Sequence, residues 1–105
     1  MSGSNGGSGF APTSPKDCNT LKIYTQLASP DSLLVGKLKI GEILAIRLIP
    51  PTGPVHVLNN SGEIVGAILS KDVAKLIECI SDGHEYRAKV LDIKGGNCQV
   101  IIAHI

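Results

Sequence analysis

The chain has 105 residues, a formal net charge of +1 and 43% hydrophobic residues. This length favours a single domain, and the near-neutral charge excludes a strong field that would attract nucleic acid or an acidic membrane from a distance. No apolar run is long enough to cross a bilayer. The only aromatic residues are Phe10, Tyr24 and Tyr86, so an aliphatic core is expected. The two tyrosines could stack on bases or belong to the core or the rim of a barrel.

Residues 1–20 are predicted to be a flexible tail or linker, and residues 21–105 a single domain. The run MSGSNGGSGFAPTSP consists almost entirely of Gly, Ser, Pro and Asn, a composition typical of flexible segments. It has neither the positive region nor the apolar region of a secretory signal.

The first half of the domain contains three predicted strands. Residues 21–27 alternate between apolar and polar side chains, which indicates a strand with one buried face. Residues 33–40 are interpreted as a short strand with an exposed basic face. Residues 43–49 are apolar on both faces except at Arg47, as expected of a central strand, and Pro50–Gly53 ends it.

Residues 54–83 have the clearest local pattern. Two short strands, 54–58 and 63–69, flank a turn at 59–62 that is rich in Asn and Gly. Ser70 is predicted to N-cap a helix, and Gly83 to end it. The helix has one apolar stripe at helical spacing, formed by Val73, Leu76, Ile77 and Ile80.

The chain ends in a predicted hairpin, with strands at 85–93 and 98–105 joined by a turn at 94–97. The connections are too short for repeated parallel crossovers, so the sheet should be mostly antiparallel. The predicted fold is therefore mainly β with one helix. It is a small, partly closed antiparallel β-barrel of about six strands, resembling an OB fold, with the helix over one opening.

Cys18, Cys79 and Cys98 are odd in number and show no CxxC spacing. They are interpreted as free thiols of an intracellular protein, cytoplasmic or nuclear, and not as a disulfide framework or a zinc site. The spacing of the cysteines and histidines fits no recurrent ligand pattern, so no metal or cofactor is expected.

No catalytic constellation emerges from the sequence. His56 lies within a predicted strand, where a structural or surface role is the simpler interpretation. His84 follows the glycine that ends the helix, and His104 precedes the last residue. The acidic residues are scattered singly, so the sequence predicts a protein that is not an enzyme.

Basic residues suggest a binding surface. Lys37 and Lys39 would share one face of the predicted 33–40 strand, and Arg47, Arg87 and Lys89 lie in other predicted strands. If those strands are neighbours, they would form a basic stripe able to contact phosphates. The alternative is that these side chains keep exposed faces soluble or protect edge strands from pairing.

Residues 34–90 resemble the HIRAN domain, a small OB-like barrel of DNA-repair remodellers and of free-standing bacterial and phage modules. The similar features are Val35-Gly36, the run GEILAI at 41–46, and VHVLNNSGEIVGAILSKDVAKLI at 55–77. The resemblance implies contact with the 3′ end of single-stranded DNA. Where the family has stacking aromatics, this chain has Lys37 and Lys39 around a leucine, so these lysines fall where a nucleic-acid contact is expected.

The leading prediction is a non-catalytic nucleic-acid-binding module that contacts DNA, single-stranded or at its ends, through Lys37, Lys39 and Arg47. The alternative is a protein-interaction adaptor or inhibitor that uses sheet edges or the helix surface. Its partner would be a larger protein or another domain of a parent chain, and neither hypothesis involves a membrane.

Overall fold

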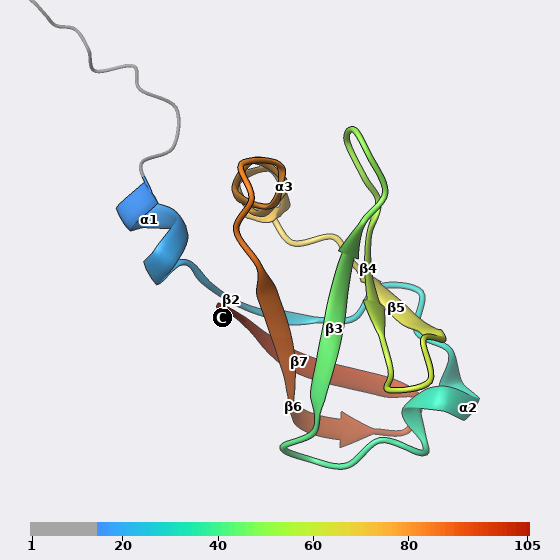
Figure 1. Cartoon of the computed structure of the whole chain (residues 1–105). Coiled ribbons are helices and arrows are strands. Elements are labelled where there is room, and N and C mark those ends of the chain that lie inside the picture. Colours follow the sequence, from blue (N-terminus) through green and yellow to red (C-terminus); the bar gives the residue numbers. More distant parts are fainter. Residues whose placement is uncertain (1–14) are drawn as a thin grey trace, which may run out of the picture.

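Six antiparallel strands curl into a partly closed barrel in the computed structural model, which describes residues 15–105 (Figure 1). The strands are β2 (Lys22–Gln26), β3 (Ile43–Leu48), β4 (Val55–Leu58), β5 (Ile64–Ile68), β6 (Tyr86–Lys94) and β7 (Asn97–His104). The helices in this range are α1 (Pro15–Thr20), α2 (Ser32–Val35) and α3 (Val73–Ser81). The predicted mainly β, antiparallel, six-stranded barrel is confirmed.

The strand order is β2-β7-β6-β3-β4-β5, so β2 and β5 form the two edges of the sheet. The chain just after β2 joins these edges. Ala28 and Ala67 exchange two backbone hydrogen bonds of 2.8 and 2.9 Å, and the N–H of Asp31 donates to the carbonyl oxygen of Val65 at 2.8 Å. These few bonds close the barrel between β2 and β5.

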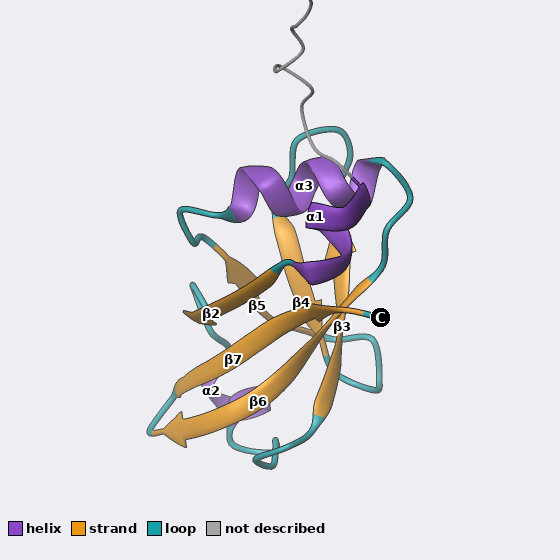
Figure 2. Cartoon of the chain, turned by 90° about the vertical axis from the view of Figure 1, so that its left-hand side faces the viewer, coloured by secondary structure: helices purple, strands orange, loops and turns teal. Residues whose placement is uncertain are grey.

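The core is aliphatic, as predicted, because alternate residues of each strand point inward. On β6 the inward residues Tyr86, Ala88 and Val90 are buried, and Tyr86 is the only aromatic side chain in the buried core of the described residues. Leu76 of α3 is fully buried, and the rest of its predicted apolar stripe packs against the core. Figure 2 shows α3 and α1 together at one end of the strands and α2 toward the other.

The helix prediction is confirmed in type and at its end. Gly83 has a φ of +100°, a left-handed conformation that glycine adopts without steric cost. The helix begins at Val73, later than predicted. Ser70 stabilises the turn before it, because its Oγ accepts a hydrogen bond of 3.0 Å from the backbone N–H of Asp72.

The predicted strand at 33–40 is wrong. Asp31 caps α2 instead, because its carboxylate accepts hydrogen bonds of 3.1 Å from the backbone N–H groups of Leu33 and Leu34. Val35 and Leu38 are the buried residues of this segment, and their spacing of three is that of a helical turn. A helix followed by a loop therefore enters β3.

β3 lies between β6 and β4 and is a central strand, as predicted, but only one of its faces is buried. Leu44 is buried, but the side chain of Ile43 is 43% exposed. Within residues 15–105 no second layer covers the outward face of β3, so Ile43 remains at the surface.

α1 corrects two predictions. Residues 15–20, placed in the flexible tail, form this helix, while residues 1–14 lie outside the described residues. Cys18 is buried and forms a disulfide with Cys79 of α3, so the free-thiol interpretation is wrong for this pair. Cys98 is a free thiol, as predicted, and it is buried. The pair is 61 residues apart in the sequence, and only the packing of α1 against α3 brings it together.

Two buried groups should make the stability of the fold sensitive to alkali. Burial raises the pKa of the Tyr86 hydroxyl, and burial followed by the charge of Asp92 raises the pKa of the Cys98 thiol. The folded state therefore keeps these protons at a pH where the unfolded chain releases them. Their stabilisation is complete below the ordinary pKa values, about 8.5 for a thiol and about 10 for a phenol, and is lost as pH rises toward the folded values.

We expect the free energy of unfolding, measured by urea titration, to fall from about pH 8.5 upward. Tyr86→Phe, compared with the unchanged protein at each pH, should reduce the part of this fall that begins above about pH 10. A stability that stays constant across this range would contradict the prediction.

Within residues 15–105, no helix combines the length and the apolar character needed to cross a membrane.

Candidate nucleic-acid interface

β3 and β6 are neighbours in the sheet, so the condition for a basic stripe is met. Ala45 of β3 pairs with Arg87 of β6, and the buried residues Leu44 and Ala88 pair on the inner side. Arg47, Arg87 and Lys89 therefore point outward from adjacent strands. Arg47 lies two residues beyond Ala45, the last residue of β3 that pairs with β6.

Two cross-strand rows of outward residues organise this side of the barrel. The first row runs through Lys22, Ala103, Arg87 and Ala45. The second runs through Tyr24, Ile101, Lys89 and Ile43. Because adjacent strands are about 4.8 Å apart, charges two strands apart in a row are spaced by about 10 Å. We call the exposed set Lys22, Tyr24, Arg47, Arg87 and Lys89 the basic face.

The two tyrosines have different environments, and this settles which of them can meet a ligand. The side chain of Tyr24 is 66% exposed within the basic face, whereas Tyr86 is 4% exposed. The hydroxyl of Tyr86 donates a hydrogen bond of 2.7 Å to the carbonyl oxygen of Cys18. Tyr24 is thus open for stacking, and Tyr86 belongs to the core.

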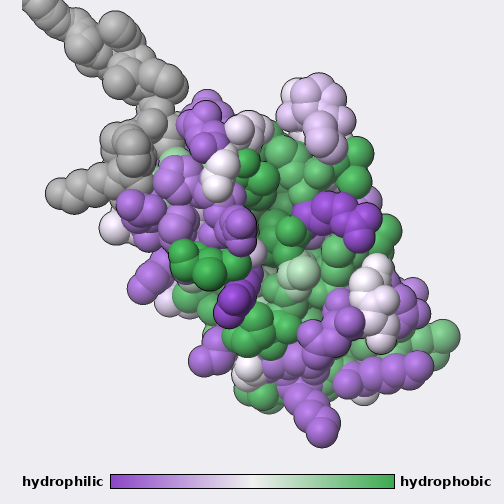
Figure 3. Space-filling view, viewed as in Figure 1, coloured by the Kyte–Doolittle hydropathy of each residue, from purple (hydrophilic) through white to green (hydrophobic). Residues whose placement is uncertain are grey.

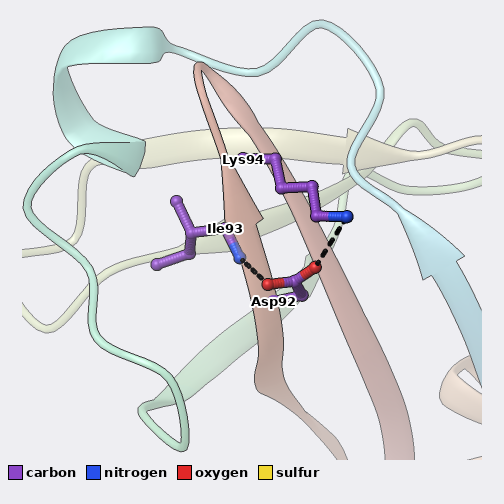
Figure 4. A network of polar contacts seen from close by, with 3 residues as sticks. All are labelled: Asp92, Ile93 and Lys94. Atoms are coloured by element: carbon purple, nitrogen blue, oxygen red, sulfur yellow. Dashed lines mark hydrogen bonds and ion pairs between the residues drawn. The ribbon is translucent and has the colours of Figure 1, made fainter.

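The basic face carries no acidic side chain. Among the outward positions at 22–26, 43–47, 87–89 and 99–103, the charged residues are all lysine or arginine. Beyond a bulge in β6 the charged side chains are no longer all basic, because Asp92 lies beside Lys94 (Figure 4). The carboxylate of Asp92 lies 3.9 Å from the Nζ of Lys94 and accepts a hydrogen bond of 3.0 Å from the N–H of Ile93. Lys94 is therefore partly neutralised and is not counted in the basic face.

The three predicted site residues do not form one strand face. Lys37 and Lys39 are exposed in the loop between α2 and β3, and Glu42 accepts a hydrogen bond of 3.0 Å from the N–H of Lys39. Arg47 lies four residues after Ile43 on β3, about 13 Å farther along an extended strand. A role of the two loop lysines in nucleic-acid contact stays a prediction.

Lys22 was missed by reasoning from the sequence, although a signal was present. The alternation in residues 21–27 places Leu21, Ile23 and Leu27 on one face and therefore places Lys22 and Tyr24 together on the other. What the alternation cannot show is that this face continues across β7 onto β6.

A hollow of about 430 Å³ opens beside the basic face, where β3 and β6 separate. Its apolar lining includes Ile43, Leu44, Ile46, Ile80, Tyr86 and Ile105. On the face of the molecule seen in Figure 3, hydrophobic surface occupies much of the middle, and hydrophilic side chains lie along its margins.

Two histidines lie near the hollow. The Nδ1 of His84 is 3.0 Å from the Nε2 of His104, so they share one hydrogen bond, and the His104 ring packs edge-on against Tyr86. His84, which follows the glycine that ends α3, is half-buried. The described residues contain no group of three or more side chains arranged to hold a metal ion.

No family model, curated protein or solved structure matches the chain. The resemblance to HIRAN domains therefore stays a prediction, and the chemistry of the surface is argued from its own residues.

Proposed function

We propose that this chain is a non-catalytic nucleic-acid-binding module that holds a single strand across the basic face. The observation that supports the proposal most directly is the pair of rows that surrounds an exposed tyrosine with basic side chains. Lys22 precedes Tyr24 by two residues on the same strand, and Lys89 lies in the same row as Tyr24. Such a combination of an exposed ring and nearby cations is typical of surfaces that bind single strands.

The two kinds of side chain have different roles. The lysines and arginines contact phosphates, and the Tyr24 ring stacks on a base. Stacking needs an unpaired base, because the flat faces of bases in a duplex are already covered by their neighbours. The proposal therefore predicts a preference for single strands over duplexes. Because the net charge is only +1, attraction should be local and not long-range.

Matched charge reversals can locate the surface. We expect Lys22→Glu with Lys89→Glu to weaken binding to a fluorescent single-stranded oligonucleotide by about tenfold or more, because repulsion replaces two phosphate contacts. The plot of log affinity against log salt should become flatter by about 1.4, at about 0.7 per phosphate lost. Fluorescence anisotropy across a salt series measures both quantities.

The control is Lys37→Glu with Lys39→Glu, since both double variants change the net charge from +1 to −3. A larger loss in the loop variant would move the site to the two lysines predicted from the sequence. Equal losses would show that only the overall charge matters, and would contradict the basic face. Oligonucleotides with free and blocked 3′ ends, tested in parallel, show whether the end recognition implied by the resemblance is present.

The proposal includes an intracellular location, which stays a prediction. This location was predicted from three free cysteines. The disulfide between Cys18 and Cys79 weakens that argument, because such bonds are typical of oxidising compartments. The thiol state of Cys18 and Cys79 in cells, measured by alkylation, is the direct check.

A further inference from the structure

The hollow adjoins the basic face through residues that belong to both. Tyr24, Lys89 and Ile43 lie in one outward row of the sheet, and Ile43 also lines the hollow. Arg87 belongs to the basic face and to the lining of the hollow. A single strand held across the basic face would therefore pass the hollow. Because Tyr24 and Ile43 are three strand spacings apart, about 14 Å, the base at the hollow is not the base that stacks on Tyr24.

The hollow has a low floor and apolar walls. Ala45 is exposed on β3, between its pairing partners Arg87 on β6 and Leu58 on β4, and it lines the hollow. Its side chain is a single methyl group, so a flat ring can lie over β3 at this point. Ile43 and Ile80 are among the apolar lining residues. The volume of about 430 Å³ lies within the usual range for small-ligand sites, about 300–1,000 Å³, and therefore suits one base.

Two oppositely charged side chains, Glu85 and Arg87, line the hollow, and both are exposed. The N–H of Ile105 donates a hydrogen bond of 2.9 Å to the carbonyl oxygen of Glu85, which extends the pairing of β6 with β7 to Glu85. Since Tyr86 between them points inward, Glu85 and Arg87 point outward together, about 7 Å apart along the strand. Within residues 15–105 neither side chain has a hydrogen-bond or ion-pair partner, so both are available to a ligand.

This pair of side chains sets a hydrogen-bond pattern that the base must match. A carboxylate accepts two parallel hydrogen bonds, and a guanidinium donates two. Guanine presents two adjacent donors, N1–H and the N2 amino group, and two adjacent acceptors, O6 and N7. Adenine, cytosine and thymine each carry a single N–H donor group, so they cannot occupy both oxygens of the carboxylate. The pattern at the hollow therefore favours guanine.

We propose that the hollow reads a guanine of the bound single strand. Glu85 accepts hydrogen bonds from N1–H and the N2 amino group, Arg87 donates to O6 and N7, and the apolar lining contacts the ring. This inference rests on the proposed function, and it adds base specificity to a surface whose phosphate contacts and stacking accept any sequence.

The probes are a fluorescent oligothymidine and the same strand with one central guanine, compared by fluorescence anisotropy on the full chain. The guanine should lower the Kd by about tenfold or more, the discrimination that one good bidentate contact provides. Two analogues test each side of the base. Inosine lacks the N2 amino group that faces Glu85, and 7-deazaguanine lacks the N7 acceptor that faces Arg87. Each should raise the Kd relative to guanine by about threefold or more, because one hydrogen bond to a charged group is lost.

Glu85→Gln and Asp92→Asn form a matched pair of variants, since each raises the net charge from +1 to +2 and only Glu85 lines the hollow. Glu85→Gln should reduce the preference for guanine to less than about threefold, because an amide has only one acceptor oxygen. Asp92→Asn should keep the full preference. Lys22→Glu with Lys89→Glu should weaken both strands by the same factor, because these lysines contact phosphates only. Circular dichroism of all variants checks that they fold.

The outcomes separate this inference from the proposed function. Binding that depends on Lys22 and Lys89 but shows no preference for guanine would overturn the inference and leave the proposed function standing. A preference that survives Glu85→Gln, or that falls equally in Asp92→Asn, would show that the hollow does not read the base. No binding of any oligonucleotide would overturn both proposals. If free guanosine monophosphate then still bound, the hollow would be a site for a nucleotide and not for a strand.

Discussion

Replacing Cys18 and Cys79 with serine is expected to lower the free energy of unfolding by about 4 kcal/mol. The disulfide joins residues 61 apart in the sequence, and closing a loop of this length strongly restricts the unfolded chain. The loss is large compared with the total stability of a small domain, about 5–15 kcal/mol. We also expect α1 to separate from α3 more readily, because the covalent link between the two helices is then lost.

Urea denaturation with and without a dithiol reductant measures this effect. Reductant should destabilise the unchanged protein by a similar amount and should have no effect on the double-serine variant. Cys98 serves as an internal control, since it is free in both proteins. A loss below about 1 kcal/mol, outside the usual range for a native disulfide, would contradict the prediction.

Gly66→Ala is expected to cost about 1–3 kcal/mol, because an added methyl group has no room at the closure of the barrel. A Cβ built on Gly66 would lie 2.9 Å from the Cβ of Leu27 and 3.1 Å from the carbonyl oxygen of Ala28. Neither atom is the free end of a flexible side chain. The neighbouring segment must therefore move, and it carries the hydrogen bonds between Ala28 and Ala67 that join the edge strands.

The matched control is Gly36→Ala. Gly36 has a φ of −64°, and its added Cβ would meet the carbonyl oxygen of Ser32 at an ordinary 3.4 Å. This change should be neutral or stabilising by up to about 1 kcal/mol. Amide exchange at Ala28 and Ala67 should accelerate in Gly66→Ala only. Equal stability of the two variants would show that the closure tolerates a side chain and would overturn the prediction.

Local patterns in the sequence predicted most of the elements correctly. The period-two alternation of β6 put Tyr86, Ala88 and Val90 on one face, and these residues are buried together in the barrel. The helical stripe of α3 and the stop at Gly83 are also confirmed. Such patterns depend on residues a few positions apart, so the printed sequence contains all the information they need.

The errors occurred where the local signal was ambiguous. At residues 33–40, alternating lysines suggested a strand, whereas the cap at Asp31 and the buried pair Val35 and Leu38 produce a helical turn and a loop. Lys37 and Lys39 were assigned to a strand face on this pattern. Because they lie in a loop, that shared strand face does not exist. Arg87 and Lys89 were recognised as basic strand residues, but whether they share a surface with other basic residues depends on which strands are neighbours.

The sequence alone thus determined most of the strands, the faces that they bury, and the aliphatic character of the core, because each property follows from spacing along one segment. Only the tertiary structure decided which segments, distant in the sequence, are neighbours in the fold. It joined Lys22 and Tyr24 to Arg87 and Lys89 across β7, and it paired Cys18 with Cys79. It also separated β3 from β6 to leave the hollow. These features depend on the order of strands in the sheet and on the packing of distant segments, which spacing within a single element does not encode.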